Sequence, residues 1–211
     1  MRIFRALAVA LLVAVPAVAA ATSYDDFLKA VNDGDVKTVG AFIGEGLDAD
    51  TADKDGNTIL MIASRLGHTD LVAYLIAHKA SVTKRSPHGD TALMFAALGG
   101  HLEIVKILVG SGAPITQSGW DALHYAAFGG HPEVIKFLLE KGADKNGLGP
   151  NGYTPLMLAA RGGFTEAVRV LLYADADMSI KGPKGETALG IAKEKKFDEV
   201  TALLQRAGAT E

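Results

Sequence analysis

The sequence contains no cysteine and a single tryptophan, and only 7% of its 211 residues are aromatic. The absence of cysteine excludes disulfides, thiolate metal sites and thiol nucleophiles. The chain also lacks the serine elbow of hydrolases, the glycine-rich phosphate loop and the paired-histidine zinc motif. We therefore predict no enzyme activity, no catalytic residue and no cofactor.

The chain has no strong excess of charge of either sign, with 21 basic against 24 acidic residues and a net charge of −3. Nucleic-acid binding needs a clustered basic patch, so no nucleic-acid partner is expected. Long apolar runs are also scarce. Beyond the N-terminal segment no run approaches the roughly 20 apolar residues of a membrane-spanning helix.

The N-terminal segment has the pattern of a secretory signal peptide. Arg2 and Arg5 precede an apolar run over 6–15, and small residues over 17–21 lead into a polar stretch. We predict a signal peptide over 1–19, with cleavage after 19 to 21 and no membrane insertion afterwards. Cleavage leaves 19 basic and 24 acidic residues. With neither cysteine nor an Asn-x-Ser/Thr site, the pattern favours export to a bacterial periplasm.

The strongest positive feature is a motif that returns about every 33 residues. It starts at Gly56, Gly89, Gly119, Gly152 and Gly185, with steps of 33, 30, 33 and 33 residues. A fixed period of this length indicates a stacked repeat array. Each unit of such an array contacts only its neighbours, so the chain should form a long surface and not one deep pocket.

One repeat can be interpreted residue by residue as two short helices. Thr154 suits the N-cap of a first helix and Pro155 its first position. Gly162 and Gly163 should end that helix, and a second amphipathic helix should start at Glu166. Equivalent positions form a leucine ladder and an alanine ladder, which predict the core: Leu60, Leu93, Leu123, Leu156 and Leu189, with Ala63, Ala96, Ala126, Ala159 and Ala192.

The sequence from Thr154 to Ala159 reads Thr-Pro-Leu-Met-Leu-Ala, and Asp121 to Ala126 reads Asp-Ala-Leu-His-Tyr-Ala. Both resemble the Thr-Pro-Leu-His-x-Ala signature of ankyrin repeats. The resemblance implies an all-α solenoid of helix-turn-helix units joined by β-hairpin-like loops. We expect about five repeats plus an N-terminal capping repeat over 24–209, with units near 24–52, 53–85, 86–117, 118–148, 149–180 and 181–209.

Two departures from the repeat are informative. The 30-residue step removes three residues from the loop 114–118, so the tip of that loop should be blunted. In the last repeat Gly190 replaces the motif histidine, and the charged run Lys193 to Lys196 replaces small residues. A polar face of this kind is required of a C-terminal capping repeat.

Histidine and methionine recur in two registers that resemble metal ladders. The first register holds His68, His101 and His131, and the second holds Met61, Met94, His124 and Met157. Repeats pack about 8–10 Å apart, whereas a zinc–nitrogen bond is about 2 Å. We therefore predict no metal site and expect each histidine of the first register to bond a neighbouring loop. Asp121 lies close to His124 and could orient it as a catalytic base, but no nucleophile accompanies the pair. A haem or metal carrier using the second register stays open as an alternative function.

The resemblance also implies a protein-binding surface. Ankyrin proteins usually contact targets through loop tips and exposed first-helix positions on the concave face. On this chain those positions are Arg65, Leu66, His88, Asp90, Phe95, Leu98, Trp120, Tyr125, Phe128, Tyr153, Leu158 and Arg161. Aromatic residues and arginine dominate interface hot spots, so these residues form the hypothetical partner site.

The partner's identity follows from resemblance only. Short exported bacterial ankyrin proteins support an oxidative-stress enzyme such as a catalase, and others neutralise secreted toxins. The sequence therefore predicts a non-enzymatic periplasmic interaction module, with catalase support as the first expectation and toxin neutralisation as an alternative.

Overall fold

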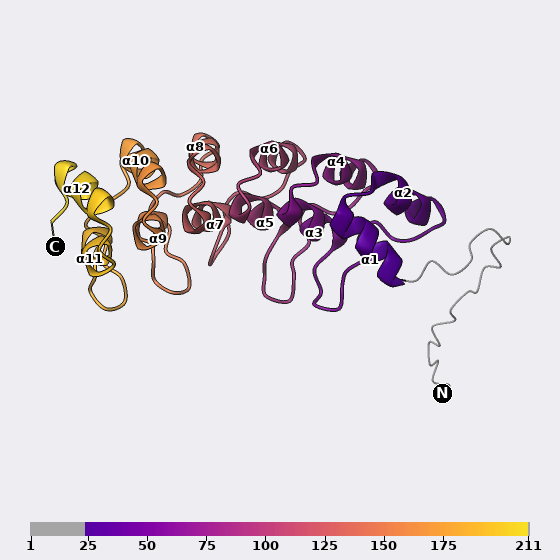
Figure 1. Ribbon diagram of the computed structural model, residues 1–211, viewed down its shortest axis with the longest axis horizontal. Coiled ribbons are helices and arrows are strands. Elements are labelled where there is room, and N and C mark those ends of the chain that lie inside the picture. Colours follow the sequence, from indigo (N-terminus) through magenta and orange to yellow (C-terminus); the bar gives the residue numbers. More distant parts are fainter. Residues whose placement is uncertain (1–23, 211) are drawn as a thin grey trace, which may run out of the picture.

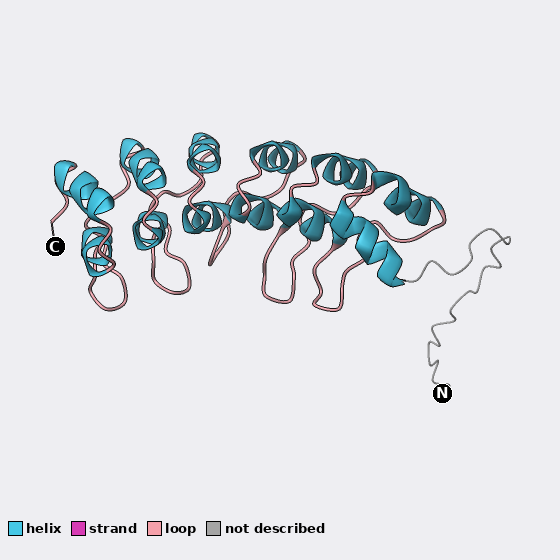
Figure 2. Ribbon diagram, in the orientation of Figure 1, coloured by secondary structure: helices cyan, strands magenta, loops and turns pink. Residues whose placement is uncertain are grey.

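The computed structural model describes residues 24–210, which form twelve helices in six antiparallel pairs (Figures 1 and 2). The first helices of the pairs are α1 (Tyr24–Asp33), α3 (Ile59–Leu66), α5 (Ala92–Leu98), α7 (Ala122–Gly129), α9 (Pro155–Gly162) and α11 (Ala188–Glu194). The second helices are α2 (Val36–Gly44), α4 (Thr69–Ala77), α6 (Leu102–Gly110), α8 (Pro132–Glu140), α10 (Thr165–Tyr173) and α12 (Asp198–Arg206). The predicted signal peptide lies outside the described residues.

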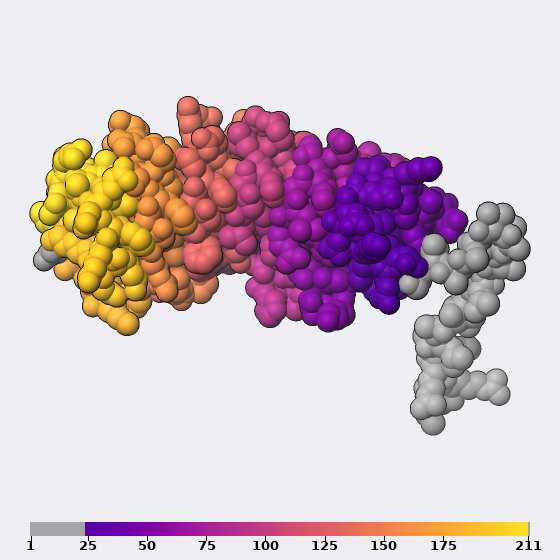
Figure 3. Space-filling view, in the orientation of Figure 1, coloured from indigo at the N-terminus to yellow at the C-terminus, as the bar shows by residue number. Residues whose placement is uncertain are grey.

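The helices form two rows, as Figure 1 shows. The first helices form an inner row that packs closely, the second helices form a looser outer row, and long loops project from the inner row. Each repeat contacts its neighbours, and the repeats follow one another in chain order along the long axis of the molecule (Figure 3). The all-α solenoid prediction is confirmed. The one isolated β-bridge between described residues joins Ala52 to Thr58, so the loops are hairpin-like without regular strands.

The helix boundaries follow from capping residues. The Thr154 side chain accepts a hydrogen bond from Met157 N at 3.3 Å, and Pro155 occupies the first turn of α9. Gly163 ends the helix with φ of 72°, a left-handed conformation that glycine adopts without strain. A threonine at this N-cap contributes about 1 kcal/mol. Thr58, Thr91 and Thr187 cap α3, α5 and α11 in the same way.

The core consists of the predicted ladders and the apolar faces of the outer helices. Every residue of the leucine and alanine ladders is at most 2% exposed. The alanines allow the inner helices to approach closely, and α10 adds Ala167, Val168 and Leu171 beneath them. Burial of such side chains stabilises the fold by roughly 25 cal/mol for each Å² removed from water. This continuous core holds the exposed residues of the inner row in fixed positions.

The histidines of the first register join successive repeats. The Nε2 atoms of His68, His101 and His131 lie 2.7, 3.1 and 2.8 Å from the carbonyl oxygens of Asn32, Arg65 and Leu98. Each acceptor belongs to the last turn of the preceding first helix and not to a loop. The final carbonyls of a helix lack intrahelical partners, so the bond satisfies one of them and links two repeats. Phe164 and Phe197 take this register in the last two repeats and pack against Gly130 and Gly163.

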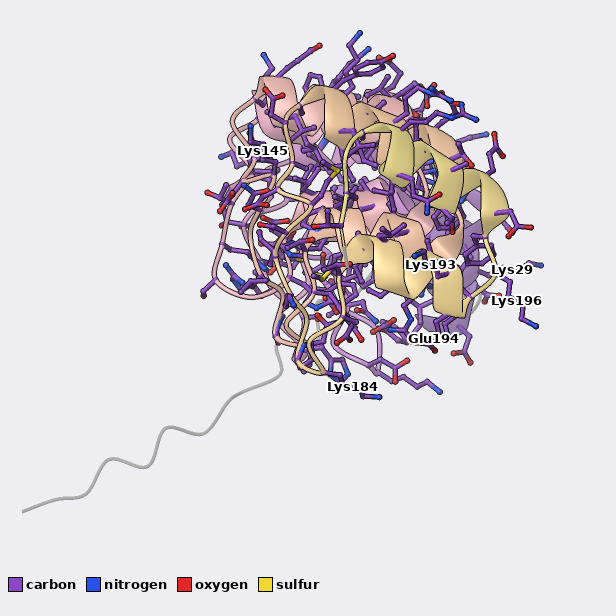
Figure 4. All side chains as sticks on the ribbon, turned by 90° about the vertical axis from the view of Figure 1, so that its left-hand side faces the viewer. Lys29, Lys145, Lys184, Lys193, Glu194 and Lys196 are labelled. Atoms are coloured by element: carbon purple, nitrogen blue, oxygen red, sulfur yellow. The ribbon has the colours of Figure 1, made fainter. Side chains whose placement is uncertain are left out.

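The C-terminal end of the stack is polar. The residues from Lys193 to Lys196 are exposed, and Lys195 Nζ lies 3.3 Å from Glu194 Oε1. Figure 4 views this end and shows Lys193, Glu194 and Lys196 around the end of α11, with Lys184 at the projecting loops. A polar outer face of this kind is typical of a C-terminal capping repeat. Among residues 24–210 no helix has the length and apolar character that crossing a membrane requires.

Candidate functional site

Trp120, Tyr125 and Phe128 form an aromatic cluster at the middle of the inner row. The Trp120 ring lies 5.2 Å from Tyr125 at an interplanar angle of 70°, and 5.9 Å from Phe128 at 62°. Such edge-to-face pairs contribute about 0.5–1.5 kcal/mol beyond their buried area. Tyr125 and Phe128 are three residues apart on α7, which places them on one face of the helix.

This aromatic cluster is accessible to a partner. Phe128 is 50% exposed, and Trp120 and Tyr125 are half-buried. Phe95 and Leu98 of α5 are also half-buried. The inner row therefore presents apolar surface on a rigid support, which is typical of interface hot spots.

An open groove of about 420 Å³ lies beside the aromatic cluster, between the loops that precede α5 and α7. Its lining includes Arg85, His88, Asp90, Gln117, Trp120 and Pro150. The groove combines an indole wall with charged and amide side chains. A second, apolar groove lies on the outer row near Tyr173.

The shortened loop forms one side of the groove, since Gln117, Ser118 and Gly119 line it. The loop before α5 is closed by two backbone bonds, from Ser86 N to Asp90 O at 2.8 Å and from Gly89 N to Ser86 O at 2.9 Å. The corresponding loop 113–121 has no such backbone pair within the described chain. The Gln117 side chain instead donates from Nε2 to Trp120 O at 2.7 Å. The prediction of a blunted tip is confirmed, since this loop projects less than its neighbours in Figure 1.

Two tyrosine hydroxyl groups fix carboxylates on the same face. Tyr125 Oη donates to Asp90 Oδ1 at 2.5 Å, and Tyr153 Oη donates to Glu186 Oε1 at 2.7 Å. Burial, and then the bond to Asp90, raise the pKa of Tyr125 well above its ordinary value. The bond to Glu186 raises the pKa of Tyr153 and lowers the pKa of Glu186. The first bond joins α7 to the loop before α5, and the second joins the loops before α9 and α11.

Two arginines flank the aromatic region. Arg65 Cζ lies 5.9 Å from the centre of the Phe95 ring, and Arg161 Cζ lies 5.8 Å from that of Tyr153. Both side chains are exposed; Arg65 lies two repeats before the aromatic cluster and Arg161 lies one repeat after it. Cation–π contacts at exposed sites contribute about 0.5–1 kcal/mol and hold the guanidinium groups over the surface.

The remaining predicted contact residues divide into exposed and buried groups. Leu66 at the end of α3 and His88 in the loop before α5 are exposed. The expectation that Leu158 is exposed is wrong, because it is 2% exposed within α9. Its register also holds the half-buried Phe95 and Tyr125, whose larger rings extend beyond the core. Leu158 is short enough to be covered completely.

Asp121 and His124 make hydrogen bonds that stabilise the start of α7. His124 is 1% exposed, its Nδ1 lies 2.7 Å from Asp121 Oδ1, and its Nε2 lies 3.0 Å from Gly147 O. The Asp121 carboxylate also accepts from the backbone N–H groups of Leu123 and His124. The pair therefore caps α7 and ties it to the following loop.

The methionines of the second register also have structural contacts. Met61 Sδ accepts from Thr58 N at 3.4 Å, and Met94 Sδ accepts from Thr91 N at 3.3 Å. Both methionines are buried. No group of three or more His, Cys, Asp or Glu residues within 24–210 has the geometry to hold a metal ion. The sulfur atoms of Met61 and Met94 therefore belong to the N-caps of α3 and α5.

Sequence reasoning missed Gln117, Gly149 and Leu148. Gln117 lies in the shortened loop, so the deletion itself was the available signal. A Cβ atom on Gly149 would lie 2.7 Å from Trp120 Nε1, so only glycine leaves room for the indole there. Leu148 is exposed in the loop after α8 and lines a separate hollow on the shortened loop, together with Asp144. No sequence signal distinguished it from a core leucine.

Comparison with known proteins gives one family. The model of ankyrin repeats in three copies matches residues 27–118, 83–148, 111–182 and 145–210. No enzyme family is found, and among curated proteins none matches significantly. Ankyrin repeats are protein-interaction scaffolds, which agrees with a site made of surface residues. The chain belongs to the ankyrin-repeat family.

Proposed function

We propose that this protein is a non-enzymatic binding module of the bacterial periplasm, which holds a folded protein partner on its inner row of helices. The aromatic cluster carries the proposal. Phe128 is 50% exposed beside an open groove, and a well-packed core fixes its position. Exposed aromatic surface on a rigid support favours binding because little conformational entropy is lost on association.

The periplasmic part of the proposal rests on the signal-peptide pattern of the N-terminal residues. The absence of cysteine agrees with a chain whose fold is independent of the redox state of its compartment. Fractionation of cells that express the full chain tests this part. Recovery of a shortened protein in the periplasmic fraction supports it, and recovery of an uncleaved protein in the cytosol refutes it.

Partner capture tests the assigned surface. Immobilised wild-type protein should retain a partner from periplasmic extract that Trp120→Ala/Tyr153→Ala protein does not retain. Phe128→Ser provides a second variant with an intact core, because Phe128 is exposed. Tyr173→Ala is the matched control, because Tyr173 is an aromatic residue on the outer row and is 80% exposed. Equal capture by all four proteins would contradict the assigned surface.

The identity of the captured protein decides between the partners that the resemblance implies. An oxidative-stress enzyme such as a catalase is the partner that we propose first, and a secreted toxin is the alternative outcome. A haem or metal carrier is not favoured by any observation here. Its ligands would be Met61, Met94, His124 and Met157, which are buried one to a repeat.

A further inference from the structure

We infer that the partner contributes an acidic segment, in which carboxylates flank apolar side chains, to the aromatic cluster and its groove. The inference rests on the proposed function and names the chemistry of the bound segment. Its evidence is the charge around the aromatic cluster, which differs from the charge of the whole chain.

Unpaired arginines surround the aromatic cluster. Arg65 and Arg161 lie at its two sides and Arg85 lines the groove. Among the ion pairs within residues 24–210, none involves these three arginines. Arg85 donates only to Gly89 O, at 3.3 Å. By contrast, Arg169 on the outer row is paired with Glu166.

Two carboxylates on this face are already engaged. Asp90 accepts from the Tyr125 hydroxyl group, and Glu186 accepts from the Tyr153 hydroxyl group and from Lys184 N. The exposed Asp55 lies at the tip of the first projecting loop, so the surface proposed to bind carboxylates of the partner does not include that tip. A chain with a net charge of −3 therefore presents free guanidinium groups around its aromatic cluster. Complementary charge sets specificity and association rate at an interface.

Trp120 supplies a further donor. Its indole N–H has no hydrogen-bond acceptor within the part of the chain that the structure describes, and it faces the backbone of Gly149 at the groove. Indole nitrogen donates and cannot accept. A carboxylate or carbonyl oxygen of the partner matches this donor as well as the arginines.

Apolar surface separates these charges. Phe128 is exposed within the aromatic cluster, and Leu66 is exposed beside Arg65 at the end of α3. Arg65 and Arg161 are three repeats apart, or about 25–30 Å at the usual helix-packing distance. About eight extended residues span that distance. The bound segment therefore has apolar residues at its centre and carboxylates towards both ends.

Selection from random peptides tests the inference without knowledge of the partner. Phage-displayed 12-residue peptides are selected on the full chain, and bound peptides are titrated by the fluorescence of Trp120, the sole tryptophan. We expect Asp and Glu to be enriched around apolar residues. Binding should weaken at least tenfold in an Arg65→Glu/Arg85→Glu/Arg161→Glu variant and also on addition of salt.

The matched control is Arg169→Glu/Arg206→Glu, which changes two arginines on the outer row, and it should alter the affinity less than twofold. Enrichment of basic or neutral peptides would overturn the inference, as would recovery of no peptide whose binding depends on the three arginines. The proposed function fails separately, when capture of the native partner is unaffected by Phe128→Ser.

Discussion

His124→Met should destabilise the fold at one identifiable connection. The substitution gives α7 the residue found at the same register in α3 and α5. It removes two hydrogen bonds of the imidazole, to Asp121 Oδ1 at 2.7 Å and to Gly147 O at 3.0 Å. The Asp121 carboxylate then stays buried without its hydrogen bond to the imidazole, and the loop before α9 loses its hydrogen bond to α7.

The magnitude follows from these two bonds. A hydrogen bond to a charged group contributes about 1.5–3 kcal/mol and a neutral one about 1 kcal/mol. Methionine fills most of the vacated volume, and Asp121 keeps its two backbone donors. We therefore expect a loss of about 3 kcal/mol in the free energy of unfolding. For a domain of this size that loss lowers Tm by about 6–12 °C.

The double variant Asp121→Thr/His124→Met is the control that the chain itself provides. It recreates the threonine–methionine cap of Thr58 with Met61, in which the buried carboxylate is absent. We expect it to lie within about 1.5 kcal/mol of the wild type by urea denaturation, because only the bond to Gly147 O is then lost. A single variant that costs less than about 1 kcal/mol, or a double variant no more stable than the single one, would refute the reasoning.

Two further predictions concern the loops and the repeat junctions. Tyr153→Phe should raise the pKa of Glu186 towards its ordinary value, because the hydroxyl group that stabilises the carboxylate is removed. Because the bond from Tyr153 lowers the pKa of Glu186 in the folded state, the bond stabilises the fold at pH values above the pKa of Glu186 in the unfolded chain. This stabilisation is lost as the pH falls through the pKa of Glu186 in the folded state. Carbon-13 NMR titration of the wild type and the variant measures the difference in the pKa of Glu186. Gly130→Ala should lower the free energy of unfolding by about 3 kcal/mol and Gly142→Ala by about 1 kcal/mol, as measured by chemical denaturation. Both glycines have positive φ, but only at Gly130 would the new Cβ lie 2.5 Å from Phe164. Equal costs at the two glycines would show that repeat packing at Phe164 is looser than described.

The sequence predicted the local structure well because each signal has a direct physical cause. The N-cap at Thr154, the helix end at Gly163 and the buried ladder that includes Leu156 depend on residues close in sequence. The histidine register was identified as structural for a sound reason, the distance between repeats. Its acceptor was placed in a loop, whereas it is the last turn of the preceding helix.

The candidate site was less predictable because exposure depends on neighbouring repeats. Leu158 and Tyr125 share a register, yet the leucine is buried and the tyrosine extends to Asp90. The role of Gln117 depends on a bond across a shortened loop, which no periodic pattern encodes. The aromatic composition of the surface could be predicted, whereas its free charges required the contacts of each arginine.

Site-specific photocrosslinking tests the central proposal most directly. A photoreactive phenylalanine analogue is placed at position 128 or at position 173, and the full chain is irradiated in its native cells. Phe128 is exposed on the inner row and Tyr173 on the outer row, so both probes are accessible to a partner. We expect one protein to be crosslinked from position 128 and not from position 173. Crosslinking from position 173 alone, or from neither position, would contradict partner binding on the inner row.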